Sequence, residues 1–156
     1  MDPGNAIAPV RTVYNSTYFH GVDEKRRVQI PAKWRPAQED VEFTMFPWPS
    51  GTLGTCLRVL PPEETARLIR FVQGMDGVNT NKADVRRKLG KDSVQVTVDK
   101  AGRICIPQAL AKEAGIEDQA VLVGLLDRFE IWSPEGFKRM NTAVDERTPD
   151  AFRMLE

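Results

Sequence analysis

Basic side chains follow an aspartate at similar spacing in two distant parts of the chain, and their chemistry suits a polyanion. They are Lys25, Arg26 and Arg27 in the first part, and Lys100 and Arg103 in the second. Lysine and arginine neutralise phosphates, and an arginine can also donate two parallel hydrogen bonds to guanine in the major groove. Lys33 follows the first group closely. These six residues are our candidates for contact with DNA.

The two basic groups belong to an internal repeat. Residues 22–31 read VDEKRRVQIP and residues 98–107 read VDKAGRICIP, so equivalent positions lie 76 apart (99 − 23 = 76). A repeat of this kind indicates two copies of one structural unit. A weaker echo later in each unit, at a spacing of 72 (131 − 59 = 72), implies four extra residues in the first unit. We place them in its proline-broken loop at residues 47–51.

Each repeated stretch has the pattern of a tight turn that leads into a strand. Asp23 and Asp99 favour the turn, and the apolar residues at alternate positions after it favour a strand that ends at a proline. Gly102 can adopt positive φ freely, whereas the equivalent residue of the first copy is Arg26. If that position requires positive φ, Arg26 is strained by roughly 1 kcal/mol. The alternative is a first turn of different shape.

The rest of the chain predicts the elements that position these turns. Alternating apolar residues predict strands at 18–22, 41–46, 55–60, 93–98, 120–125 and 128–132. Start and stop signals predict helices from Pro61 to Gly74 or Gly77, at 82–89, at 107–114 and from Ser133 to about Met140. We therefore divide the chain into a flexible arm (1–16), a first repeat (17–75), a linking helix (76–92), a second repeat (93–140) and a C-terminal tail (141–156).

Composition excludes several classes of function. The chain has 22 basic and 22 acidic residues, so any binding to nucleic acid must come from a local patch. It has no apolar run long enough to span a membrane and no secretory signal pattern. Cys56 and Cys105 do not suggest a disulfide framework, and a single histidine, His20, makes a metal site improbable. Because the sequence contains no catalytic motif, we expect that the protein is not an enzyme and uses no cofactor or small-molecule substrate.

The local patch exists, but a second interpretation of it stays open. Residues 21–35 carry five basic and two acidic side chains. The alternative to DNA contact is that Arg27 and Arg103 pair with Asp23 and Asp99 and only brace the turns. A second basic run, residues 86–88, is typical of a solvated helix face, with Asp84 placed to pair with Lys88. The three tryptophans, Trp34, Trp48 and Trp132, favour core or subunit packing over stacking on bases.

The doubled motif resembles the MraZ family, within the wider AbrB and MazE group of swapped-hairpin DNA-binding proteins. The resemblance spans roughly residues 17–140. It implies a mixed fold of β with α structure, in which tandem AbrB-like repeats form a β pseudobarrel capped by helices. It also implies that Arg27 and Arg103, with Lys25 and Lys100 beside them, contact double-stranded DNA.

The same resemblance implies a biological role. MraZ proteins are cytoplasmic, nucleoid-associated regulators of the division and cell-wall gene cluster, and they bind as ring-shaped homo-oligomers to short direct repeats upstream of their own operon. Two alternatives stay open. One is a ring-forming protein-interaction module with weak or no DNA binding, and the other is an antitoxin-like member of the AbrB group.

Overall fold

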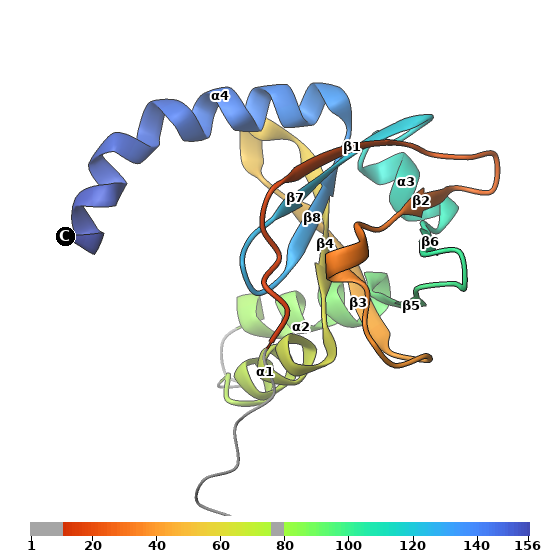
Figure 1. Ribbon diagram of the computed structural model, residues 1–156. Helices are drawn as coiled ribbons and strands as arrows, with labels where there is room; N and C mark the ends of the chain where they lie inside the picture. Colours follow the sequence, from red (N-terminus) through yellow and green to blue (C-terminus); the bar gives the residue numbers. More distant parts are fainter. Residues whose placement is uncertain (1–10, 76–79) are drawn as a thin grey trace, which may run out of the picture.

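A six-stranded antiparallel sheet and a separate two-stranded pair form the body of the protein (Figure 1). The structure is a computed structural model and describes residues 11–75 and 80–156. The large sheet contains, in spatial order, β1 (Thr17–Gly21), β7 (Gln119–Gly124), β8 (Phe129–Trp132), β4 (Thr55–Leu60), β3 (Glu42–Pro49) and β5 (Val94–Thr97). The small pair contains β2 (Arg27–Gln29) and β6 (Arg103–Cys105). The fold is thus mixed, with β-sheet and helices.

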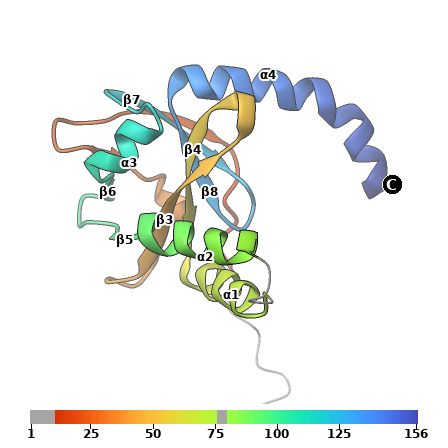
Figure 2. The ribbon, with the colours of Figure 1, turned by 180° about the vertical axis from the view of Figure 1, so that it is seen from behind.

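Four α-helices accompany the strands in the described part of the chain. They are α1 (Pro62–Gln73), α2 (Thr80–Asp92), α3 (Gln108–Glu113) and α4 (Pro134–Ala151). Helices α1 and α2 lie at one end of the body and α4 at the other, and the far end of α4 projects away from the sheet in both views (Figures 1 and 2). Short 3-10 turns occupy Ala32–Trp34, Gly51–Leu53 and Phe152–Leu155. Of the described helices, none has the length and apolarity needed to cross a membrane.

The two halves of the chain exchange their leading strands. Strand β1 precedes the first turn but pairs with β7, from the second half. Strand β5 precedes the second turn but pairs with β3, from the first half. The hairpins β3–β4 and β7–β8 then join through β4 and β8 at the centre of the sheet. Each half therefore completes the sheet of the other.

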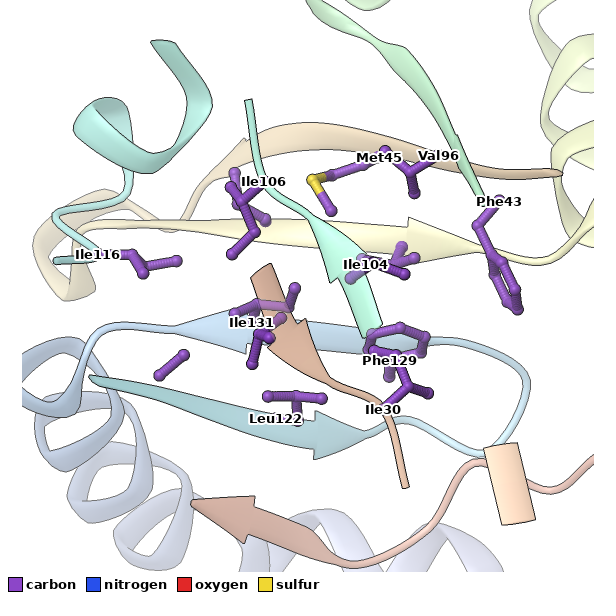
Figure 3. Packing of buried hydrophobic residues seen from close by; sticks show 14 of the residues in the cluster. Ile30, Phe43, Met45, Val96, Ile104, Ile106, Ile116, Leu122, Phe129 and Ile131 are labelled. Atoms are coloured by element: carbon purple, nitrogen blue, oxygen red, sulfur yellow. The ribbon is translucent and has the colours of Figure 1, made fainter. Parts of the chain in front are cut away.

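The buried faces of β2 and β6 pack against the large sheet. Val28, Ile30, Ile104 and Ile106 are buried, as the alternation of apolar residues requires. Figure 3 shows Ile30, Ile104 and Ile106 among side chains of the large sheet, including Phe129. Burial of this face fixes the strand register, because a slip by one residue would turn the apolar side chains outward. The opposite, polar face is left to solvent.

Trp34 lies at the centre of an aromatic cluster in this core. Its side chain is fully buried, and its ring centroid lies 5.2 Å from that of Tyr18, 5.0 Å from that of Phe129 and 5.8 Å from that of Tyr14. The expected packing role of Trp34 is confirmed. Tyr14 shows that ordered structure begins earlier than Thr17, because its backbone pairs with Leu126 and its ring is buried. Residues 1–10 of the predicted arm lie outside the described residues.

The proline-rich segment after Phe46 is strand, so the predicted long, proline-broken loop is wrong. Strand β3 continues to Pro49, with Pro47 opposite Leu57 and Pro49 opposite Thr55. Strand β5 pairs with β3 only as far as Met45, so the later part of β3 has one free edge. Proline is tolerated there because no neighbouring strand needs its missing N–H. The extra residues of the first half thus lengthen the hairpin.

Two helices extend further than the sequence predicted. Helix α2 begins at Thr80 and passes through Gly90 to Asp92, although residues 76–79 of the predicted linking segment lie outside the described residues. Helix α4 begins with Ser133 as N-cap, as expected, but continues past Met140 to Ala151. Because its distal half projects from the body, that half needs no apolar face. Its polar composition therefore resembles that of a tail.

Candidate nucleic-acid interface

Pairing of β2 with β6 brings the two repeated turns together. Arg27 lies opposite Cys105, and Gln29 lies opposite Arg103, in an antiparallel register. Two backbone hydrogen bonds extend the pairing, from Ile30 N to Gly102 O and from Ile106 N to Arg26 O, each 2.8 Å. Segments that are 76 residues apart in sequence therefore form one continuous surface.

The first turn is held by the side chain of Asp23. Its Oδ1 accepts hydrogen bonds from the backbone N–H groups of Lys25 (2.9 Å) and Arg27 (2.8 Å), and its carbonyl accepts one from Arg26 N (2.9 Å). The Arg27 guanidinium closes the turn, since its Nε donates to Asp23 Oδ2 at 2.7 Å. This is the local bonding that makes aspartate favourable in a turn.

The second turn has the same pattern of bonds. Asp99 Oδ1 accepts from the N–H groups of Ala101 and Arg103, both at 2.9 Å, and the Asp99 carbonyl accepts from Gly102 N at 2.9 Å. Arg103 Nε donates to Asp99 Oδ2 at 3.1 Å, and Arg103 Nη1 lies 3.9 Å from Asp23 Oδ2. Both arginines are therefore braced by aspartate, and the two turns share one charge cluster.

Bracing uses only part of each guanidinium. Arginine carries five N–H donors, and each aspartate engages the one at Nε directly. The Arg27 and Arg103 side chains stay 32% and 31% exposed. Fixing a guanidinium through Nε orients its terminal amino groups and lowers the entropy cost of a further contact. The arrangement is therefore compatible both with a structural brace and with recognition of a planar or anionic partner.

Acid is expected to weaken this pair of turns. Backbone hydrogen bonds from Arg27 and Arg103, followed by their guanidinium groups, hold the pKa of Asp23 and Asp99 below the usual range. The folded state thus binds fewer protons than the unfolded chain, whose aspartates have a pKa of about 3.9. The stabilisation is present above that pH and is lost as pH falls through the lowered folded-state pKa values.

Urea midpoints measured from pH 6 to pH 3 would show this loss. The variant with both Asp23→Asn and Asp99→Asn should have a flatter dependence than the wild type, whereas Asp145→Asn, on exposed α4, should not. If the double variant kept the full acid dependence of the wild type, the two carboxylates would not be its source.

Arg26 adopts a left-handed backbone conformation. Of the two interpretations that the sequence left open, this is the one with a strained arginine at the glycine position of the turn. Its φ is +59°, and the equivalent Gly102 has φ +82°, so the two turns have the same shape. The Arg26 side chain is half-buried, and its Nε donates to the carbonyl of Ile106 at 3.0 Å. This contact offsets part of the cost of the left-handed conformation, which is about 1–2 kcal/mol.

Paired substitutions separate the two effects at Arg26. Arg26→Ala keeps the backbone strain and loses the hydrogen bond, so it should lower the free energy of unfolding by about 1 kcal/mol. Arg26→Gly loses the same bond but relieves the strain, so it should be more stable than Arg26→Ala by about 1 kcal/mol. Urea unfolding at fixed protein concentration measures both. Equal stability of the two variants would show that the left-handed backbone carries no cost here.

Beside the second turn, the guanidinium of Arg35 takes the place that the Arg26 side chain has beside the first, which sequence reasoning missed. Its Nε donates to the carbonyl of Ile30 at 2.8 Å, and its guanidinium lies against Gly102, where an added Cβ would meet it. Gln29 also bridges the halves, because its Nε2 donates to the carbonyl of Ala101 at 3.0 Å. The only sequence signal for Arg35 was that it is one of the five basic residues in the segment 21–35. That count does not show where its side chain points.

Two of the three predicted lysines lie beside the charge cluster, and the third lies apart from it. Lys25 and Lys100 are exposed at the tips of the two turns. Lys33 follows β2 on the 3-10 turn, where its Nζ lies 5.9 Å from the centre of the Tyr18 ring. Of the six predicted residues, the structure thus brings Lys25, Arg26, Arg27, Lys100 and Arg103 to the paired turns. Lys33 contacts β1 instead.

Other candidate sites have structural explanations. In the described residues, no group of histidine, cysteine and acidic side chains is arranged to hold a metal ion. In the second basic run, the predicted pairing of Asp84 with Lys88 is wrong. Asp84 pairs with Arg87 at 3.1 Å, and Lys88 pairs with Asp92 at 2.6 Å. Pairing at i, i+3 is as accessible on a helix as pairing at i, i+4, so spacing alone did not decide it.

Comparison with known proteins agrees with the doubled motif. Residues 91–154, which contain the second turn, match the family described as "MraZ protein, putative antitoxin-like". The chain is 33% identical to the transcriptional regulator MraZ of Rickettsia rickettsii (strain Sheila Smith), over 86% of this chain and 90% of that protein. It is also 33% identical to the transcriptional regulator MraZ of Rickettsia felis (strain ATCC VR-1525 / URRWXCal2), over 84% of this chain and 89% of that protein.

Proposed function

Because this chain belongs to the MraZ family, we propose that it is a transcriptional regulator that binds double-stranded DNA in a sequence-specific manner. The register of β2 against β6 carries the proposal, since it places two equivalent, arginine-bearing turns on one surface. Its relatives are named as regulators, which fits a protein that is not an enzyme.

In this mechanism, aspartate positions arginine for DNA. Asp23 and Asp99 hold Nε of Arg27 and Arg103, and the terminal amino groups then contact guanine or phosphate. Lys25 and Lys100 contact phosphates on either side. Arg26, through its remaining nitrogens, and Lys33 extend the phosphate contacts. Phosphate contacts would position the protein, and one or two arginines would specify sequence.

A ring-shaped homo-oligomer would multiply a patch that is weak in one chain. The whole chain has no net charge, and aspartates pair with two of the arginines in the turns, so a single pair of turns neutralises few phosphates. Several chains in a ring would present several pairs of turns at high effective concentration to a direct-repeat operator. We propose that the operator lies upstream of the protein's own operon in the division and cell-wall cluster. The protein would then be cytoplasmic and nucleoid-associated.

The exchanged strands support a finer description of the fold. We propose that residues 17–75 and 93–140 are AbrB-like swapped-hairpin repeats, linked by residues 76–92 and flanked by an arm (1–16) and a tail (141–156). The two sheets would then form a β pseudobarrel capped by helices. Pairing of β1 with β7 and of β5 with β3 supports this description, because each half lends a strand to the other.

Fluorescence anisotropy with two labelled duplexes tests the proposed function. One duplex would carry the sequence upstream of the protein's own gene, and the other would have the same composition in scrambled order. The proposal expects tighter binding to the native duplex and a steep loss of affinity as salt rises, because bound arginine and lysine release counterions. Equal affinity for both duplexes at all salt concentrations would contradict sequence-specific recognition.

A second candidate function rests on the charge balance of the turns. Asp23 and Asp99 neutralise much of the cationic charge of Arg27 and Arg103, and the chain as a whole is neutral. A ring-forming protein-interaction module with weak or no DNA binding has these same features. A folded oligomer that bound neither duplex even at low salt would favour this function.

A further inference from the structure

A cavity of about 390 Å³ lies between helices α1 and α2 and strands β3 and β5. This end of the molecule is opposite to α4 in both views (Figures 1 and 2). Apolar side chains form most of its wall, namely Phe46, Leu68, Ile69, Val72 and Leu89. Its size is within the range of small-molecule sites, which are mostly apolar with a few convergent polar groups.

Arg86 places one positive charge in the wall of this cavity. Among the described residues, it is the only charged side chain in the wall. Its neighbours in sequence are neutralised, since Arg87 pairs with Asp84 and Lys88 pairs with Asp92. Within the described part of the chain, the Arg86 guanidinium forms no comparable ion pair or hydrogen bond. Among the described side chains, it is therefore the cation of the basic run without an ionic partner, and the other described residues of the cavity wall are uncharged.

The polar part of the wall also presents donors. Thr65 Oγ1 donates to Thr44 Oγ1, and Thr44 Oγ1 donates to Gln95 Oε1, each at 2.9 Å. This chain of hydrogen bonds occupies the carbonyl oxygen of Gln95 and leaves its amide nitrogen as the group available to a ligand. Ser93 adds a hydroxyl to the same wall. Donors and a cation without an acidic side chain favour an anionic group on the ligand.

We propose that this cavity binds an apolar monocarboxylate, such as a medium-chain fatty acid. The carboxylate would pair with Arg86, and the hydrocarbon chain would pack against Leu68, Val72 and Leu89. A neighbouring hollow carries Asp40 and Glu42, so repulsion would keep the carboxylate at the Arg86 end. The site does not depend on the proposed DNA binding, because it shares no residue with the paired turns.

Calorimetric titration with octanoate tests this site in the full chain. We expect one octanoate per chain and about tenfold weaker binding in Arg86→Ala, which loses a charge-assisted hydrogen bond. Octan-1-ol has the same hydrocarbon chain without the charge, so its affinity should be the same in Arg86→Ala and wild type. Arg87→Ala is the matched control, because it removes an adjacent arginine outside the cavity wall.

A second variant tests the apolar part of the cavity. Val72→Trp should fill it and abolish binding of both octanoate and octan-1-ol, while circular dichroism shows that the fold is retained. Absence of octanoate binding to the wild type would overturn the proposal. Octanoate binding that was unchanged in both Arg86→Ala and Val72→Trp would also overturn it, since the ligand would then lie elsewhere.

Discussion

Arg27→Ala is expected to weaken binding to operator DNA by roughly ten- to a hundredfold, the loss typical of one bidentate arginine–guanine contact. Arg27 occupies the more basic of the two turns, beside Lys25 and Arg26, and its guanidinium is already oriented by Asp23 at 2.7 Å. Truncation removes the donors and also releases the aspartate, whose unpaired negative charge then faces the phosphates. Anisotropy titrations of wild type and variant at the same salt concentration measure the loss.

The salt dependence shows whether the lost contact was electrostatic. Arg27→Ala should have a shallower slope of affinity against salt than the wild type, because fewer counterions are released. Arg147→Ala is the matched control, since Arg147 lies on α4 and its Nε donates to its own helix at Ala143 O. If Arg27→Ala bound the operator as tightly as Arg147→Ala, the paired turns would not be the DNA-binding surface.

Trp34→Ala is expected to lower the free energy of unfolding by about 3–5 kcal/mol, the usual cost of removing a buried aromatic side chain. Trp34 is fully buried between Tyr14, Tyr18 and Phe129. Removal of the indole side chain would leave a cavity in the core, next to the 3-10 turn that follows β2. Urea unfolding at fixed protein concentration measures the change, because assembly would also contribute to stability.

Trp34→Phe provides the control for size and aromaticity. In the described part of the chain the buried Nε1 of Trp34 has no hydrogen-bond partner. Phenylalanine keeps an aromatic ring there and removes that unsatisfied donor, whose burial costs about 1–3 kcal/mol. Trp34→Phe should therefore lower the free energy of unfolding by less than about 1.5 kcal/mol. A loss as large as that of Trp34→Ala would mean that the cluster does not tolerate any change of shape, contrary to the packing argument.

Local signals predicted most of the elements correctly. Alternating apolar residues identified both short strands, β2 and β6, because burial of one face imposes a period of two. Ser133 before Pro134 marked the start of α4, and the structure shows its side chain accepting from Gly136 N at 3.0 Å. The internal repeat predicted the left-handed backbone of Arg26, because the equivalent glycine suggested what the turn requires.

Long-range pairing could not be read from the sequence. The pattern of β1 shows that one face packs inward, but not that its partner is β7, about a hundred residues later. The prolines of β3 indicated a loop because proline lacks the N–H that a strand paired on both sides must donate. They are tolerated in β3 because β5 pairs with it only as far as Met45, and the sequence does not reveal where that pairing ends. The length of α4 was missed because a projecting helix needs no apolar face to persist.

The same limit applies to the candidate site. Composition identified the basic residues, and the repeat identified which of them are equivalent. The direction of the Arg26 side chain, towards Ile106 O, and the contact of Arg35 with Gly102 depend on the register of β2 against β6. Side chains that interact only across paired strands cannot be assigned before the pairing is known.

Photo-crosslinking from Cys105 would show directly whether operator DNA lies against the paired turns. Cys105 is exposed on β6, opposite Arg27, whereas Cys56 is fully buried, so a thiol-reactive photo-crosslinker should attach at the paired turns. The control carries the same probe on α4, in a chain with Cys105→Ser and Glu146→Cys. We expect operator DNA to crosslink to the Cys105 probe, with competition by unlabelled operator, and not to the α4 probe. Operator binding by the Cys105-labelled protein without a crosslink above the level of the α4 probe would contradict the paired turns as the DNA-binding surface.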